Sequence, residues 1–174
     1  MNQQKRIRSF HEGQCMDAYR LFGAHFCVEE HRRGVRFTVY APHAVKVWVA
    51  GSFTDWGNNR IAMNVQDGIW SVFVEGLQEG ESYKYVIQDF RGNIFYKSDP
   101  YAFFSEVRPS TASRIYDIEQ LVWNDIWWQR GKCDNYDRPV SIYEVYAGGW
   151  KETDGISVYE MLEKELIPYV LKMG

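Results

Sequence analysis

Short segments in which apolar and polar residues alternate, separated by turn residues, fill the first two thirds of this 174-residue chain. A period of two places every second side chain on the same face of a β-strand. The pattern is clearest over 35–40 and 45–50, which flank an Ala-Pro-His corner and which we expect to form a hairpin. Further strands are expected over 61–65, 69–74, 82–88 and 94–97. No helical periodicity interrupts them, so the sequence predicts a β-sandwich of about a hundred residues.

One of these strands runs directly into the loop Gly-Ser-Phe-Thr-Asp-Trp at 51–56. Gly51 allows a sharp turn, and Asp55 can accept hydrogen bonds from nearby backbone amides. Trp56 is therefore carried on a connection and not inside a strand. A tryptophan in that position either covers the end of the core or offers a flat surface to a ligand, and the residues alone leave both readings open.

Composition limits the classes of partner. Apolar residues make up 45% of the chain and aromatic residues 17%, which suffices for a core and leaves rings over for binding a sugar or a peptide. The net charge of −3 and the absence of a dense Lys/Arg run argue against nucleic acid. The first eight residues are polar and basic, with no apolar run behind them, which predicts a cytoplasmic protein with no membrane partner.

The spacing of cysteines and histidines indicates no metal site. No two of them form a Cys-x-x-Cys motif or a helical pair of histidines four residues apart. We therefore expect reduced thiols, no disulfide, no metal and no cofactor. The residues concerned are Cys15, Cys27, Cys133, His11, His25, His31 and His43.

The pattern changes after residue 117. An aromatic-rich stretch with three tryptophans leads to an apolar segment at 140–145, which predicts a strand. Ser157 begins a capping-box pattern, and apolar residues then recur every four positions, which predicts a helix that Pro168 kinks or restarts. A strand followed by a helix is half of a βαβ unit, and its neighbouring strands are absent from this sequence.

The motifs resemble the front end of a bacterial 1,4-α-glucan (glycogen) branching enzyme of the α-amylase superfamily. They occur in the family's order at 21–25, 34–37, 41–44, 51–56, 68–70, 83–85, 97–102 and 108–113. Segments 139–150 and 165–170 resemble the first strand and first helix of the family's catalytic barrel. After Tyr-Glu-Val the family usually has a histidine and then Leu-Gly-Ser-Trp, whereas this chain has Tyr146, Ala147 and two glycines before Trp150.

The resemblance implies a mainly β protein. It predicts an immunoglobulin-like β-sandwich of the early-set type, a carbohydrate-binding module of family 48, followed by an incomplete first strand-helix unit of a (β/α)8 barrel. The implied division is an N-terminal extension at 1–17, the module at 18–117, an aromatic-rich connector at 118–138 and the start of the barrel at 139–174.

Catalysis is not expected from this chain alone. Retaining α-glucan chemistry needs a nucleophilic carboxylate and a carboxylic acid roughly 5 Å apart, and in this family both lie on later barrel strands than the one present here. The resemblance therefore implies the non-catalytic segment of an enzyme that transfers α-1,4-glucan chains to 6-hydroxyls. The alternative is a stand-alone glycogen-binding or scaffold domain. The partial barrel unit favours the first reading, because a dedicated binding domain has no use for it.

The resemblance also suggests a binding site for α-1,4-glucan or glycogen. By analogy with the glycogen-binding subunit of an energy-sensing kinase, Trp56 and Tyr96 are expected to be stacking platforms and Lys84 a donor to sugar hydroxyls. Three plainer readings stay open: Trp56 closes the sandwich, Lys84 is simply solvated, or the module mainly docks the barrel. The rest of the barrel is the expected partner in cis, and its absence would favour self-association through bare apolar surface.

Overall fold

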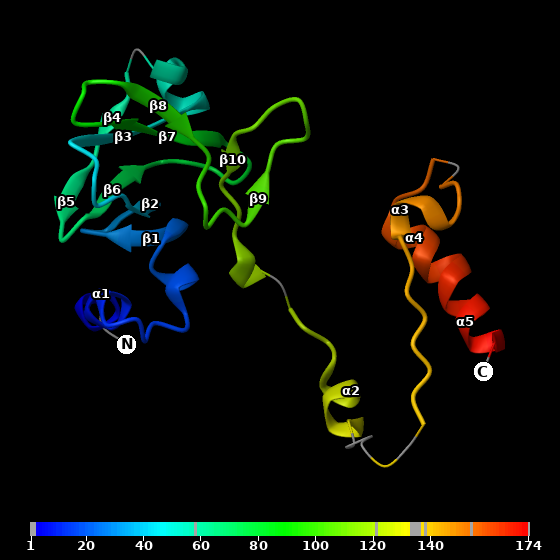
Figure 1. Ribbon diagram of the computed structural model, residues 1–174. Helices are drawn as coiled ribbons and strands as arrows, with labels where there is room; N and C mark the ends of the chain where they lie inside the picture. The colour runs from blue at the N-terminus through cyan, green and yellow to red at the C-terminus, as the bar shows by residue number, and fades with distance from the viewer. Residues whose placement is uncertain are drawn as a thin grey trace. The chain divides into compact units, whose positions relative to one another are not determined.

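The computed structural model describes residues 3–57, 59–120, 122–132, 137, 139–153 and 155–173 (Figure 1). The chain divides into two compact units, Met1–Val122 and Trp123–Gly174. The first unit contains all the strands of the described residues, and the second contains only helices and irregular segments. None of the helices among these residues is long and apolar enough to cross a membrane.

The first unit consists of two antiparallel sheets. Sheet A has the order β1-β2-β6-β5, with β1 at Gly23–Glu29, β2 at Arg32–Tyr40, β6 at Ile69–Glu75 and β5 at Asn64–Gln66. Sheet B has the order β4-β3-β7-β10-β9, and β8 also pairs with β7. Its strands are β4 at Ile61–Ala62, β3 at Lys46–Gly51, β7 at Ser82–Gln88, β8 at Ile94–Lys97, β9 at Phe104–Ser105 and β10 at Ser113–Arg114.

One hydrophobic core joins the two sheets into a sandwich. Phe37 of sheet A and Tyr83 of sheet B are both fully buried, and their rings meet edge to face with centroids 4.9 Å apart. The hydroxyl of Tyr85 donates across the core to the backbone oxygen of Thr38 at 3.2 Å. The alternating residues Val35 and Phe37 of β2, and Val47 and Val49 of β3, are buried in this core, and the predicted β-sandwich is present.

The hairpin predicted over 35–50 is wrong. β2 pairs with β1 and β6, whereas β3 pairs with β4 and β7 in the other sheet. The Ala-Pro-His corner therefore carries the chain across the sandwich, and the indole nitrogen of Trp70 donates to Ala41 O at 3.0 Å to hold it. Alternation shows which face of a strand is buried, but it does not show which strand is its neighbour.

A helix, α1 at Gln3–His11, covers the outer face of sheet A. The centroid of the Phe10 ring lies 4.6 Å from that of Phe22 and 5.0 Å from that of Tyr40. Ile7 packs on the same small cluster, which includes Ile69 of β6. A short 3₁₀ turn at Ala18–Arg20 then leads into β1.

The second unit contains α2 at Ile126–Gly131, α3 at Ala147–Trp150, and a helix that runs from Val158 to Met173 in three parts. These parts are α4 at Val158–Met161, a π-helical turn at Leu162–Leu166 and α5 at Ile167–Met173. The predicted cap is formed, since Ser157 Oγ accepts from Glu160 N at 3.1 Å. Pro168 is the second residue of α5, directly after the π-helical turn. It lacks an N–H donor, so a change in hydrogen-bonding pattern at this point is expected.

The strand predicted over 140–145 is not formed. Residues 139–146 have no regular secondary structure, and within the described part of the second unit no strand is available to pair with them. A strand gains its backbone hydrogen bonds only from a neighbour, whereas a helix forms them within one segment. This difference explains why the capped helix is present and the strand is not.

Candidate functional site

The outer face of sheet B presents a row of side chains across four strands. Trp48 pairs with Ala62 on one side and Val86 on the other, and Val86 pairs with Tyr96. Directly paired residues project from the same face of a sheet, so this row points away from the core-facing Tyr85. Trp48 and Tyr96 are two strands apart, or about 10 Å. Val86 is fully buried between them, while Tyr96 is 46% exposed.

The turn after β3 is built to hold one conformation. A Cβ on Gly51 would lie 2.2 Å from Ser82 O, so only glycine fits at the end of this strand. The buried Thr54 hydroxyl accepts from Gly51 N at 2.9 Å and donates to Gly51 O at 3.2 Å. These contacts close the turn on itself and fix the direction in which the 3₁₀ segment Ser52–Gly57 leaves the sheet.

Two non-glycine residues in this turn have a left-handed backbone. Asp55 has a φ of 48° and Trp56 a φ of 55°. Aspartate tolerates this region, but a bulky residue there carries a strain of about 1–2 kcal/mol. Strained backbone of this kind is concentrated at functional sites, where the surrounding structure imposes it. The surrounding turn therefore holds Trp56 in a conformation that such a residue rarely adopts.

Phe53, and not Trp56, closes the end of the core. The ring of Phe53 stacks on Phe37 at a centroid distance of 5.9 Å and packs against the main core cluster. Trp56 remains 41% exposed. Tyr96 adjoins the same turn, because its hydroxyl oxygen lies 2.9 Å from the position that a Cβ on Gly57 would occupy. The structure thus places the turn that carries Trp56 beside Tyr96.

Lys84 lies on the same face of β7, two residues before Val86. Its Nζ donates to Thr111 Oγ1 at 2.7 Å, and no carboxylate among the described residues pairs with it. Thr111 is in turn next to Ser98, whose hydroxyl donates to Thr111 O. Sequence reasoning missed Thr111 as a site residue. Its motif at 108–113 was noticed, but nothing in it indicates that a loop so distant in sequence lies beside Lys84.

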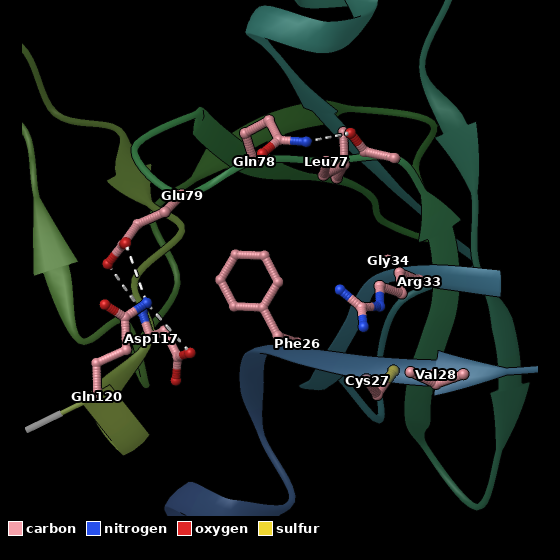
Figure 2. Close-up of a pocket in the computed structure, with 11 residues that line it drawn as sticks. Phe26, Cys27, Val28, Arg33, Gly34, Leu77, Gln78, Glu79, Asp117 and Gln120 are labelled. Carbon is pink, nitrogen blue, oxygen red and sulfur yellow. Dashed lines mark hydrogen bonds between the residues drawn. The ribbon is translucent and has the colours of Figure 1, made fainter.

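A separate cleft of about 580 Å³ lies at the β1 edge of sheet A, and Figure 2 shows Phe26 projecting into it. Its far wall is closed by Glu79, which accepts from Asp117 N at 3.2 Å and from Gln120 Nε2 at 3.4 Å. Arg33 and Val28 line the opposite side. None of the three predicted site residues belongs to this cleft, and Phe26 is the only aromatic residue in its lining.

A buried carboxylate supports the turn behind Tyr96. Asp99 accepts from the hydroxyls of Tyr83 at 2.6 Å and Tyr85 at 3.2 Å, and from Tyr101 N at 2.8 Å. Burial raises the pKa of Asp99 above its usual range, although the tyrosine hydroxyls oppose that effect. Burial and the nearby Asp99 also raise the pKa of Tyr83. The hydrogen bond from Tyr101 N closes a turn at Asp99, and the contacts with Tyr83 and Tyr85 make this carboxylate part of the core.

The described residues contain no group of three or more histidine, cysteine or acidic side chains arranged to hold a metal ion. Cys15 and Cys27 are free thiols, and burial raises the pKa of both. Cys133, the third cysteine of the sequence analysis, lies outside the described residues. The functional groups exposed on the outer face of sheet B are therefore aromatic rings and hydrogen-bond donors.

The chain is similar to known proteins over much of its length. Residues 21–102 match the family described as carbohydrate-binding module 48 (isoamylase N-terminal domain). The chain is 46% identical over 174 residues to a 1,4-alpha-glucan branching enzyme of Geobacillus stearothermophilus and 41% identical over 169 residues to one of Bacillus cereus (strain AH187). These matches cover 97% and 94% of the chain, but it spans only about a quarter of the two enzymes, 27% and 26% of their lengths.

Among solved structures, the fold resembles that of a pullulanase variant of Paenibacillus barengoltzii. The TM-score is 0.50 with 24% sequence identity, over 64% of this chain and 16% of that one. The sandwich is a carbohydrate-binding module of family 48. The chain as a whole corresponds to the N-terminal portion of a glycogen branching enzyme, as the order of its motifs implied.

Proposed function

We propose that this chain is the non-catalytic, α-glucan-binding segment of a 1,4-α-glucan branching enzyme, and that its immunoglobulin-like sandwich of the early-set type holds α-1,4-glucan or glycogen on the outer face of sheet B. The observation that carries the proposal is the placing of Trp56 and Tyr96. Both rings are exposed beside one rigid turn, while Phe53 fills the core below. Glucosyl units have apolar C–H faces that stack on such rings.

The polar partners of this site are Lys84 and Thr111. Lys84 Nζ has three donors and the described structure uses one of them, on Thr111 Oγ1. The other donors are available to sugar hydroxyls, and the hydroxyl of Thr111 can accept from Lys84 and donate onward at the same time. A sugar site needs this combination, because flat rings supply most of the contact area and a few polar groups fix the orientation.

The function of the whole protein is a proposal of the same kind. The relatives are about four times longer than this chain, which covers 27% of the first enzyme compared. We propose that residues 139–174 are the first strand and helix of the catalytic barrel, after the N-terminal extension at 1–17, the module at 18–117 and the connector at 118–138. The barrel in cis would then transfer α-1,4-glucan chains to 6-hydroxyls. This chain alone is expected to have no branching activity in an iodine-staining assay on amylose, because the carboxylate pair lies on later strands.

Hydrogen exchange tests the proposed barrel start. Amides of 139–146 should exchange rapidly, since no strand in the described structure pairs with them, while those of β2, β3 and β6 should exchange slowly. Three tryptophans of the second unit, Trp123, Trp127 and Trp128, are more than 60% exposed, which supports docking or self-association in the absence of a barrel. Protection of 139–146 equal to that of β3 in a dilute monomer would contradict the proposal.

Affinity electrophoresis tests glucan binding. In native gels cast with glycogen, the wild-type chain should be retarded, and Trp56→Ala should weaken binding about ten- to a hundredfold through loss of a stacked ring. Phe90→Ala is a matched control, because Phe90 is 78% exposed at the β7–β8 turn on the same sheet. Equal retardation of the wild type and Trp56→Ala would show that Trp56 has no part in binding and would overturn the site.

A further inference from the structure

Arg60 is held over the ring of Trp48 on the outer face of sheet B. Its guanidinium carbon lies 4.2 Å from the centroid of the indole ring. A guanidinium that stacks on an aromatic ring in this way is attracted by the ring's negative face. Stacking fixes the position of the planar group, and its N–H donors remain in the plane of the guanidinium.

The hydrogen-bonding capacity of this arginine is unused. No side-chain hydrogen bond or ion pair of Arg60 is found within the part of the chain that the structure describes. Arg60 is only partly exposed, yet none of its nitrogen atoms is both buried and without a partner, so its unpaired donors reach solvent. The same argument applies to the indole N–H of Trp48, which has no hydrogen-bond partner among these residues.

The Arg60–Trp48 stack lies on the same row as Tyr96, one of the two proposed platforms. Trp48 is separated from Tyr96 by Val86 alone, and Arg60 precedes Ala62, which pairs with Trp48 from the outer strand β4. Lys84 is on the central strand β7. The cationic side chains of the exposed face therefore include Lys84 beside Thr111, Arg60 over the ring of Trp48 toward β4, and Lys46 two residues before Trp48 on β3. A row about 10 Å wide is longer than one glucosyl unit.

We propose that Arg60, held in place by Trp48, is a further glucan-contacting residue, which donates hydrogen bonds to the hydroxyls of a glucosyl unit beyond the one stacked at Trp56 and Tyr96. This inference rests on the proposed function and deepens it. A planar fork of donors matches two adjacent oxygens better than a point charge does, and neighbouring sugar hydroxyls are such a pair. The consequence is a preference for longer chains, because a short oligosaccharide fills the platforms without reaching Arg60.

Calorimetric titration of the 174-residue chain with maltotriose and maltoheptaose tests this proposal. Arg60→Ala should weaken maltoheptaose binding about three- to tenfold and change maltotriose binding by less than about twofold. Arg60→Lys should recover only part of the loss, because lysine keeps the charge without the planar fork. Arg33→Ala removes a cation from sheet A and should leave both affinities unchanged. As a second readout, the Trp48 indole N–H resonance, assigned with Trp48→Phe, should shift with maltoheptaose.

The outcomes separate the two proposals. Loss of binding in Trp56→Ala together with unchanged maltoheptaose affinity in Arg60→Ala would overturn the role of Arg60 and leave the glucan site in place. If maltotriose and maltoheptaose affinities fell equally in Arg60→Ala, the stack would support the sheet and would not contact a distal glucosyl unit. No binding of either sugar by the wild type would overturn the proposed function itself. Thermal unfolding of each variant shows that it is folded.

Discussion

The two outer faces of the sandwich differ in what covers them. On sheet A, α1 lays Ile7 and Phe10 against Ile69 and its neighbours, and Glu29 forms an ion pair with Arg36 on the same face. On sheet B, no α-helix of the described first unit covers the row from Trp48 to Tyr96, and Tyr96 is 46% exposed. A helix thus covers part of the outer face of sheet A, although Tyr40 there remains 42% exposed, whereas no such helix covers the row on sheet B.

Under the proposed function, the exposed rings on sheet B bind glucan and do not result from poor packing. The chain can evidently cover an apolar face, since α1 does so on sheet A. The turn that exposes Trp56 is also held by specific contacts, with Gly51 and Thr54 closing it and two left-handed residues inside it. Such strain needs a compensating benefit. Substitutions on the two faces should therefore separate into effects on stability and effects on binding.

The largest expected effect is on stability, from sheet A. Phe10→Ala removes a ring that meets both Phe22 and Tyr40, and it should lower the free energy of unfolding by about 2–4 kcal/mol. Urea unfolding followed by circular dichroism measures this change. Glycogen binding below the transition should stay at the wild-type level. A stability change under about 0.5 kcal/mol would mean that α1 does not cover the face.

A smaller effect, on binding alone, is expected from sheet B. Tyr96→Ala removes one exposed platform and should weaken maltoheptaose binding about five- to thirtyfold, with little change in stability because the ring is 46% exposed. Tyr96→Phe keeps the ring and should bind within about threefold of the wild type. If Tyr96→Ala unfolded the protein as readily as Phe10→Ala does, the contrast between the two faces would be lost.

Much of the sandwich could be predicted because its strands follow a local rule. The segments 82–88 and 94–97 coincide with β7 and β8, and the Asp67–Gly68 turn joins β5 to β6 with Gln66 opposite Ile69. The strand with which each strand pairs could not be predicted. The Ala-Pro-His corner joins strands of different sheets, because alternation is the same for a hairpin and for a crossing. Residues 1–17 gave no sign that α1 would cover sheet A.

The residues of the candidate site came from a resemblance in their motifs, and their role in binding stays a prediction. The structure places Lys84 and Tyr96 on the outer face of sheet B and Trp56 in the turn that adjoins Tyr96. Thr111 and Arg60 were missed, since each depends on a contact between segments: Thr111 meets Lys84 across 27 positions, and Arg60 meets Trp48 after a turn. A single threonine or arginine in a loop carries no local signal of such a contact.

The smallest expected effect tests the ion pair of sheet A by its dependence on pH. Hydrogen bonds from Arg36 hold the pKa of Glu29 below its ordinary value of 4.5. A carboxylate with a lowered pKa in the folded state stabilises the protein above pH 4.5, and this contribution is lost as the pH falls through the folded-state pKa.

Glu29→Gln should therefore lower the free energy of unfolding by about 0.5–1 kcal/mol at pH 7, a small value because both side chains are about a third exposed. Near pH 3 the difference from the wild type should shrink, and glycogen binding at pH 7 should be unchanged. Urea unfolding at the two pH values measures this difference, with Glu12→Gln, directly after α1, as a control for a more exposed ion pair. A difference that stayed the same at both pH values would show that packing, and not the charge on Glu29, stabilises this face.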